Sequence, residues 1–175
     1  MQRAQYNGHK RRHAFKAHAV ISPSGMVVHY FGPVEGRHHD SWLLRESGLY
    51  TLVATLTING VDYQIYADSA YPVMRNLVPP IPRSAAPSGS AAASLNTTMS
   101  GVRIVSEWWY QIQTNTFQTM DFSRWQRQFL TLPSLQYHVG MLLVNCRTCM
   151  LSGNRISKYF GVDPPSLDEY LAGSF

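Results

Sequence analysis

The feature that most constrains the fold of this chain is a short apolar run that ends on an acid and leads directly into a turn. The run covers Tyr63–Ala67, Asp68 closes it, and Ser69–Pro72 has the composition of a turn. This pattern indicates a β-strand with a carboxylate at its C-terminal end. Farther along, apolar residues recur at helical spacing in Val102–Trp109, a stretch that also carries Glu107. A chain that combines strands and helices in this way is expected to fold as an α/β protein.

The length and composition of the chain fit one globular domain. It has 175 residues, of which 45% are hydrophobic, and a chain of this size can bury a substantial core. The apolar stretch 132–145 is interrupted by Gln136 and His138 and is too short to span a membrane. The start of the chain shows no secretory signal pattern. We therefore expect neither a membrane protein nor a secreted one, and the sequence leaves the oligomeric state open.

Positive charge gathers at the start of the chain. Residues 1–34 contain five basic residues and no acidic one, which accounts for the whole formal net charge of +5. Lys10, Arg11 and Arg12 are consecutive, which indicates contact with DNA phosphates through counterion release, or a weak nuclear-localisation cluster. The alternative is a solvated basic terminus with no ligand.

The chain contains two cysteines, Cys146 and Cys149, a number that suits a reducing compartment rather than a disulfide framework. Their spacing raises the question of zinc, but structural zinc takes four ligands and His138 is the only other candidate nearby. Cysteines in an apolar helix usually act as small buried hydrophobes, and we favour that interpretation here.

The first half of the chain predicts strands, then short helices, then another strand. Residues 14–22 and 26–31 are rich in β-formers and are joined by Pro23–Gly25, so we expect an antiparallel hairpin that ends at Gly32-Pro33. The remaining elements expected here are helices over 40–45 and 49–56, a turn at Asn59-Gly60 and a strand over 61–67.

The second half predicts a loop followed by helices. Residues 79–95 hold four prolines among Ser, Ala and Gly, which indicates a flexible surface insertion. A long helix is expected to begin near Asn96–Thr98 and to end near Asn115, with further helices over 123–130 and 134–143. Ser166 and Glu169 have the spacing of a capping box at the start of a short last helix.

Asp68 and Glu107 offer the oxygen ligands that a hard divalent cation prefers. Mg²⁺ is usually held by one or two carboxylates with water completing its shell, and phosphodiester cleavage by two metal ions uses carboxylates from different elements. Arg103 stands four residues before Glu107 on the same helix face, where it could orient the carboxylate or contact a phosphate. The alternatives are a surface ion pair between Arg103 and Glu107, and a turn or capping role for Asp68.

Four blocks in order carry a resemblance to a known family: Tyr6–His13, Gly36–Asp40, Ala67–Pro72 and Val102–Trp108. They resemble the DDE superfamily endonuclease domain of Harbinger-type transposases and their domesticated relatives. The similarity covers nearly the whole chain, and its later part includes Leu143–Cys146, Tyr159–Gly161 and Pro164-Pro165.

The resemblance implies a single RNase H-like nuclease domain over residues 1–175, with a mixed sheet that begins with the antiparallel hairpin and is flanked by helices. It implies cleavage and transfer of DNA strands with Mg²⁺ or Mn²⁺, in which Asp68 matches the second catalytic acid and Glu107 the third. The first acid, in an Asp-Gly-Thr context on the opening strand, has no match, because no acid precedes Glu35.

We therefore expect a nuclear protein whose domain lacks its first strand and first catalytic acid, and which is inactive or incomplete as written. The alternative is a non-catalytic DNA-binding or protein-binding relative. No helix-turn-helix pattern precedes the domain, so recognition of a DNA sequence would come from a separate protein.

Asp40 closes the block Gly36–Asp40 and is a further candidate metal ligand, although the residues alone favour a helix N-cap. His38 and His39 suit contact with a phosphate or an outer ligand better than direct binding of a hard cation. Two positions depart from the family pattern. Ala67 stands where Gly usually precedes the acid, and Trp109 is bulkier than the residue expected there.

Overall fold

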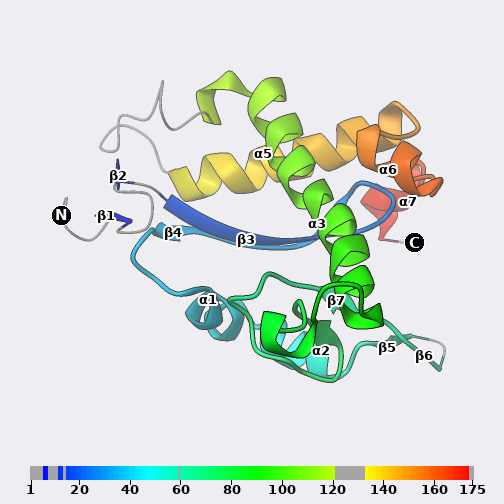
Figure 1. Cartoon of the computed structure of the whole chain (residues 1–175). Coiled ribbons are helices and arrows are strands. Elements are labelled where there is room, and N and C mark those ends of the chain that lie inside the picture. Colours follow the sequence, from blue (N-terminus) through cyan, green and yellow to red (C-terminus); the bar gives the residue numbers. More distant parts are fainter. Residues whose placement is uncertain (1–5, 8–11, 14, 59, 121–132, 174–175) are drawn as a thin grey trace. The chain divides into compact units, whose positions relative to one another are not determined.

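The computed structural model describes residues 6–7, 12–13, 15–58, 60–120 and 133–173. The chain divides into two compact units. We call residues 1–37 with 105–175 the hairpin unit, and residues 38–104 the middle unit. Helix α3 (Ala91–Thr116) contributes its first part to the middle unit and its second part to the hairpin unit. Helices and strands occur together in the chain, so the expected mixed α/β class is confirmed (Figure 1).

The antiparallel hairpin is confirmed as strands β3 (Phe15–Ile21) and β4 (Val27–Glu35). Our expectation that Gly32-Pro33 ends the second strand was wrong, because β4 continues to Glu35 opposite Phe15. The pairing register shifts between Lys16 and His18, and this irregularity lets the strand pass through Gly32. Gly32 has a φ of 117°, and a Cβ there would lie 2.8 Å from the Lys16 carbonyl oxygen, so only glycine fits.

After α3, the described residues 133–173 of this unit form three helices. They are α5 (Pro133–Met150), α6 (Arg155–Phe160) and α7 (Leu167–Ala172). The helix expected over 134–143 is confirmed and runs seven residues farther, to Met150. The capping box of the last helix is also confirmed, since the Ser166 side chain accepts from the Glu169 backbone and Glu169 reaches back to Ser166. The helix expected over 123–130 lies outside the described residues, and strands β1 (Tyr6–Asn7) and β2 (Arg12–His13) pair with each other.

The core of the hairpin unit joins the hairpin to α3, α5 and α6. It consists of Val27, Val105, Trp109, Val144 and Ile156. Trp109 and Ile156 are fully buried, so the bulky Trp109 packs in the core. Asn145 ties α5 to β4, because its side chain accepts from the Val27 N–H at 3.0 Å and donates to the Val27 carbonyl at 2.9 Å. An amide that is 1% exposed and satisfies both backbone groups fixes the helix against the strand.

The middle unit begins with α1 (Asp40–Glu46) and α2 (Leu49–Ala54), and both short helices are confirmed. Their buried residues are Leu43, Leu44, Leu49 and Val53. Gly48 separates the helices with a φ of 73°, a conformation that favours glycine.

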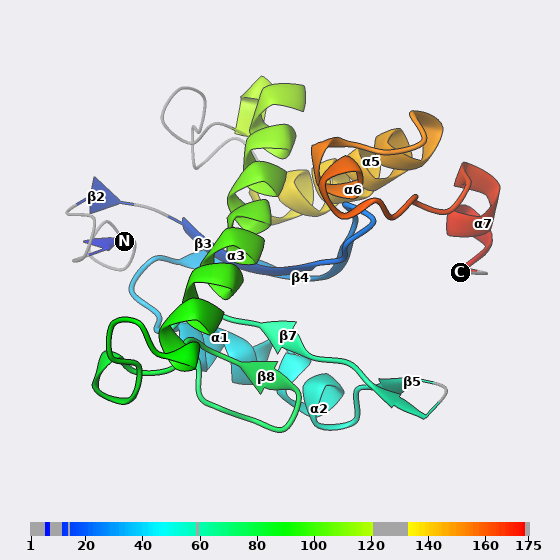
Figure 2. The same cartoon turned by 45° about the vertical axis from the view of Figure 1, so that its right-hand side comes forward.

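The strand expected over 61–67 is split in two. Residues Val61–Asp62 form β6, which pairs antiparallel with β5 (Thr57–Ile58), and Ile65–Tyr66 form β7, which pairs in parallel with β8 (Leu77–Val78) (Figure 2). The chain changes partner between the two segments: the Tyr63 N–H donates to Leu56, whereas the Ile65 N–H donates to Asn76. This change of partner divides residues 61–67 into two strands. The apolar content of the segment alone does not reveal the division.

Helix α3 begins at Ala91, earlier than the expected start near Asn96–Thr98. Three alanines follow Ser90, whose hydroxyl accepts from the Ala93 N–H at 3.1 Å and caps the helix there. Asn96 has another task, because its side chain bonds both the N–H and the carbonyl of Ile81, each at 2.9 Å. These bonds and the short helix η2 (Arg83–Ala85) give the Pro-rich segment a defined path. The search of the described residues found no helix long and apolar enough to span a membrane.

Candidate metal centre

Asp68 lies two residues beyond β7, at the edge where the parallel pair β7–β8 ends. The Ala67 N–H donates to Val78 at 3.1 Å, so the backbone remains paired until the residue before the acid. The Asp68 carbonyl then accepts from the Tyr71 N–H at 3.0 Å and closes a turn. This arrangement fixes the Asp68 backbone, while its side chain remains 54% exposed.

Both oxygens of the Asp68 carboxylate have contacts within the middle unit. Oδ1 accepts from the Ser69 N–H at 2.6 Å and from the Ser69 hydroxyl at 3.2 Å. Oδ2 accepts from Arg103 Nη1 at 3.3 Å, which is long for a charge-assisted hydrogen bond. Arg103 therefore contacts Asp68, a pairing that the spacing of residues on one helix did not indicate. An exposed pair of this length is weak and exchanges readily with solvent or another ligand.

Asp40 shares an electrostatic environment with Asp68. The hydroxyl of Tyr71 has its pKa raised to about 12, first by burial and then by the negative charges of Asp40 and Asp68. The negative charges of two carboxylates thus act on one hydroxyl. The N-cap interpretation of Asp40 was wrong, since His39 is the N-cap of α1 and Asp40 is its first helical residue. An acid in the first turn still stabilises the helix dipole.

Glu107 lies on the part of α3 that belongs to the hairpin unit. Val105 and Trp109 are buried in the core, so Glu107 between them points outward and is exposed. Its neighbour Trp108 packs against α6, where the Arg155 guanidinium lies 3.8 Å from the centroid of the indole ring. The helix therefore presents Glu107 to solvent from a rigid position.

The remaining expected site residues are placed as follows. Arg12 belongs to β2, whereas Lys10 and Arg11 lie outside the described residues. The His38 ring stacks on Trp42, with 3.8 Å between centroids and 16° between planes. The carbonyl of His39 accepts the first backbone bonds of α1. Both histidines thus have structural contacts at the start of this helix.

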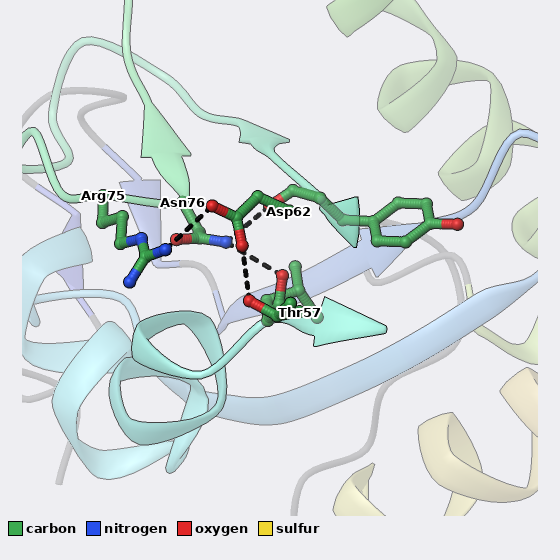
Figure 3. A network of polar contacts seen from close by, with 6 residues as sticks. Thr57, Asp62, Arg75 and Asn76 are labelled. Atoms are coloured by element: carbon green, nitrogen blue, oxygen red, sulfur yellow. Dashed lines mark hydrogen bonds and ion pairs between the residues drawn. The ribbon is translucent and has the colours of Figure 1, made fainter. Parts of the chain in front are cut away.

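Sequence reasoning missed a polar network around a different acid, Asp62 (Figure 3). Its carboxylate accepts from the Thr57 hydroxyl through Oδ1 and from Arg75 Nη2 at 2.9 Å through Oδ2. These two bonds hold the pKa of Asp62 below its usual value, with Thr57 as the larger cause. Beside it, the buried Asn76 donates to the carbonyls of Leu56 and Tyr63 at 2.9 and 2.8 Å. The sequence offered one signal. Thr57 and Asp62 flank the predicted Asn59-Gly60 turn, and in an antiparallel pair such residues lie opposite each other.

The donors around Asp68 fit a hard divalent cation in chemical type. Asp68 and Asp40 supply carboxylate oxygens within the middle unit, and Mg²⁺ or Mn²⁺ needs only one or two of these because water completes its shell. Within the described ranges, no three His, Cys, Asp or Glu side chains form a ready-made metal-binding group. A metal ion would therefore bind with much of its water retained.

Comparison with known proteins gives the family. The family model described as DDE superfamily endonuclease matches residues 1–145. The chain belongs to the DDE superfamily endonucleases. No match was found among curated proteins or among solved structures. Endonucleases of this superfamily generally use divalent metal ions and act on DNA.

The family match confirms the DDE superfamily part of the resemblance, whereas the Harbinger subtype stays a prediction. The matched range contains Asp40, Asp68, Arg103 and Glu107. It ends at residue 145, so α6 and α7 lie beyond it.

Proposed function

We propose that this DDE superfamily endonuclease binds Mg²⁺ or Mn²⁺ through Asp68 and Glu107 and acts on DNA phosphodiesters with an RNase H-like fold. The observation that carries the proposal is the Asp68 carboxylate, which is fixed at the end of β7, half exposed and only loosely paired with Arg103. The family match over residues 1–145 supports it, since these endonucleases use divalent metals. A bound ion would activate the attacking hydroxyl or water and stabilise the leaving oxygen.

Arg103 has two roles in this proposal. Without metal, its guanidinium neutralises Asp68 and keeps the carboxylate in position. A cation that binds Asp68 competes with Arg103 for the negative charge of this carboxylate and weakens their long contact, so the guanidinium can turn toward a DNA phosphate. Metal and phosphate binding should therefore favour each other.

Asp40 and Tyr71 support Asp68. Asp40 is a further candidate ligand, because its charge acts on the same hydroxyl as the charge of Asp68. Tyr71 keeps its proton at neutral pH, as its pKa is raised to about 12, so it can donate a hydrogen bond to a carboxylate or to a phosphate oxygen.

The basic start of the chain provides the non-specific part of DNA binding in this proposal. Lys10, Arg11 and Arg12 would contact phosphates and release counterions, with affinity that falls as salt rises. The same cluster would direct the protein to the nucleus. Reading of a target sequence would fall to a separate DNA-recognition protein.

Titration with Mn²⁺ tests the metal site. The electron paramagnetic resonance signal of free Mn²⁺ reports the bound fraction, and we expect Asp68→Asn to weaken binding by more than the roughly 10–100-fold that loss of an outer-sphere partner costs. Asp62→Asn is the matched control, because Asp62 is an acid of the same unit that is 48% exposed and paired with arginine. Equal affinity in wild type and Asp68→Asn would overturn the proposal.

A second candidate function is DNA binding without cleavage. It is favoured by the five basic residues of residues 1–34, which suit binding of DNA phosphates whether or not cleavage follows. Under this alternative residues 1–175 bind Mn²⁺ and DNA but do not nick supercoiled plasmid. Nicking that requires Mn²⁺ and disappears in Asp68→Ala would exclude the alternative.

A further inference from the structure

Helix α6, beyond the range that the family matches, exposes two cations and an aromatic ring on one face. Ile156 and Ser157 are buried and fix the helix to the core of the hairpin unit. Arg155, Lys158 and Tyr159 have the helical spacing of a shared face and are exposed, Tyr159 by 53%. We call these three residues together with Trp108 the α6 platform.

The side chains of the α6 platform hold one another in place. Arg155 lies flat over the Trp108 indole at 3.8 Å, and Tyr159 meets the same indole edge to face, with 5.4 Å between ring centroids. Stacking on an aromatic face leaves the N–H edge of a guanidinium directed outward for an anion. Tyr159 also packs on Phe160 at 4.9 Å. The platform is therefore ordered before any ligand binds, which lowers the entropy lost on binding.

The α6 platform is also anchored to the rest of its unit. Asn154 caps the helix in a reciprocal capping box with Ser157. The same Asn154 amide donates to the Gly25 carbonyl in the β3–β4 turn at 2.8 Å and to the Thr148 hydroxyl on α5 at 3.1 Å. Figure 2 shows α6 beside α5. A helix of six residues is thus fixed by its cap and its buried side chains rather than by its own length.

The charge around the α6 platform favours an anionic partner. Among the described residues 133–162 there is no Asp or Glu, and this interval contains Arg147, Arg155 and Lys158. Glu107 is the acid next to the platform in sequence, since it immediately precedes Trp108 on α3. Cations interleaved with exposed aromatic rings are the pattern by which proteins hold single-stranded nucleic acid, with phosphates on the cations and bases stacked on the rings.

We infer that the α6 platform binds an unpaired stretch of the DNA substrate, with Arg155 and Lys158 on phosphates and Tyr159 stacked on a base. This inference rests on the proposed function, because it assumes that the chain acts on DNA. An exposed ring can stack only on a base that is free of its complement, so the partner is single-stranded rather than duplex. Glu107, as a candidate metal ligand one residue before Trp108, would then lie close to the bound strand.

The test measures binding of a labelled oligothymidylate of about 15 nucleotides, and of the duplex that it forms with its complement, by fluorescence anisotropy in EDTA. We expect Tyr159→Ala to weaken single-strand binding about 10-fold or more, while Tyr159→Phe retains it because the ring remains. Lys158→Ala should weaken binding severalfold and reduce the slope of log affinity against log salt by about 1. The controls are Tyr50→Ala, at a tyrosine that is 49% exposed in the middle unit, and Arg83→Ala.

Two results would overturn the inference. One is that Tyr159→Ala and Lys158→Ala bind the oligonucleotide as tightly as the two controls do. The other is that Tyr159→Ala weakens duplex binding as much as single-strand binding, because that pattern indicates phosphate contact without base stacking. Metal is absent from the assay, so the outcome is independent of Asp68. If the oligonucleotide assay fails and the Mn²⁺ titration succeeds, only the inference about the α6 platform is refuted. If the Mn²⁺ titration fails and the oligonucleotide assay succeeds, only the proposed metal site is refuted.

Discussion

Two acid–arginine pairs in the middle unit show how the same residue types can have different consequences. Asp62 pairs with Arg75 at 2.9 Å, and its other oxygen is taken by the Thr57 hydroxyl. Asp68 pairs with Arg103 at 3.3 Å, and its other oxygen is satisfied by its neighbour Ser69. The carboxylates have similar exposure, 48% and 54%. Exposure therefore does not distinguish the two acids. They differ in the distance to the arginine and in the residue that bonds the other carboxylate oxygen.

The difference indicates which acid can exchange its partner. The bond from Thr57 to Asp62 connects the paired strands β5 and β6, and Arg75 holds the other oxygen from outside that sheet, so a cation that removed these bonds would also weaken the strand pair. The bond from Arg103 to Asp68 joins residues far apart in sequence and is long, so a cation can replace the arginine at small cost. On this comparison we propose that Asp62 mainly serves the structure, whereas Asp68 can exchange its partner for a metal ion.

The largest expected effect is on stability, at the residue that supports the Asp62 network. Asn76→Ala removes the donor for two carbonyl groups and should lower the free energy of unfolding by about 1–3 kcal/mol. Urea unfolding followed by circular dichroism measures this. Asn115→Ala, at an exposed position of α3, is the control and should have little effect. Equal stability of the two variants would mean that the Asp62 region is not anchored as described.

The next prediction concerns competition at Asp68. Arg103→Gln removes the guanidinium that shares Oδ2 with an incoming cation, so Mn²⁺ affinity without DNA should rise about 2–5-fold. Arg75→Gln provides the matched control and should leave Mn²⁺ affinity unchanged. An equal rise in Mn²⁺ affinity in both variants would show an effect of net charge alone. It would contradict the claim that Arg103, unlike Arg75, competes with the cation.

The pKa of Tyr71 should respond to the charges of Asp40 and Asp68. We expect its phenol to titrate near pH 12, since burial and then Asp40 and Asp68 raise its pKa. Because the folded pKa lies above the usual value of 10.0, the stability that Tyr71 contributes is complete below pH 10 and declines as pH rises toward 12. Carbon-13 NMR of ζ-labelled tyrosine measures the pKa. Asp40→Asn should lower it only in part, and an unchanged value would show that Asp40 does not face this hydroxyl.

The smallest effect is expected on the acid side of the stability profile. The Thr57 hydroxyl is the main cause of the lowered pKa of Asp62, so Thr57→Val should bring that pKa back toward its usual value. A carboxyl whose folded pKa is lowered stabilises the fold above its unfolded pKa and loses this contribution as pH falls. Thermal unfolding below about pH 4 should therefore depend less on pH in Thr57→Val than in wild type. Thr51→Val controls for the change from threonine to valine. If the unfolding temperature depends equally on pH in all three proteins, the Thr57 hydroxyl does not lower the pKa of Asp62 as described.

Local sequence signals predicted many elements because their determinants lie close together. The turn Pro23–Gly25 indicated the hairpin, and Ser166 with Glu169 indicated the last helix. The contacts missed are those between distant residues. Asn145 bonds Val27 across 118 positions, and Asn76 bonds Leu56 across 20, so both pairs exceed the length of a single local pattern. The same limit applies to the site, where the sequence indicated Asp68 as a ligand but not its contact with Arg103.

The measurement that tests the central claim most directly is cleavage of the protein by hydroxyl radicals generated at a bound metal ion. Fe²⁺ can replace Mg²⁺ at an oxygen site, and with ascorbate and peroxide it cuts the backbone close to where it is bound. We predict cuts near Asp68 and near Glu107 in the same molecules, both suppressed by excess Mg²⁺ and absent in Asp68→Asn. Cuts near only one of the two acids, or cuts that persist in Asp68→Asn, would contradict a metal site shared by Asp68 and Glu107.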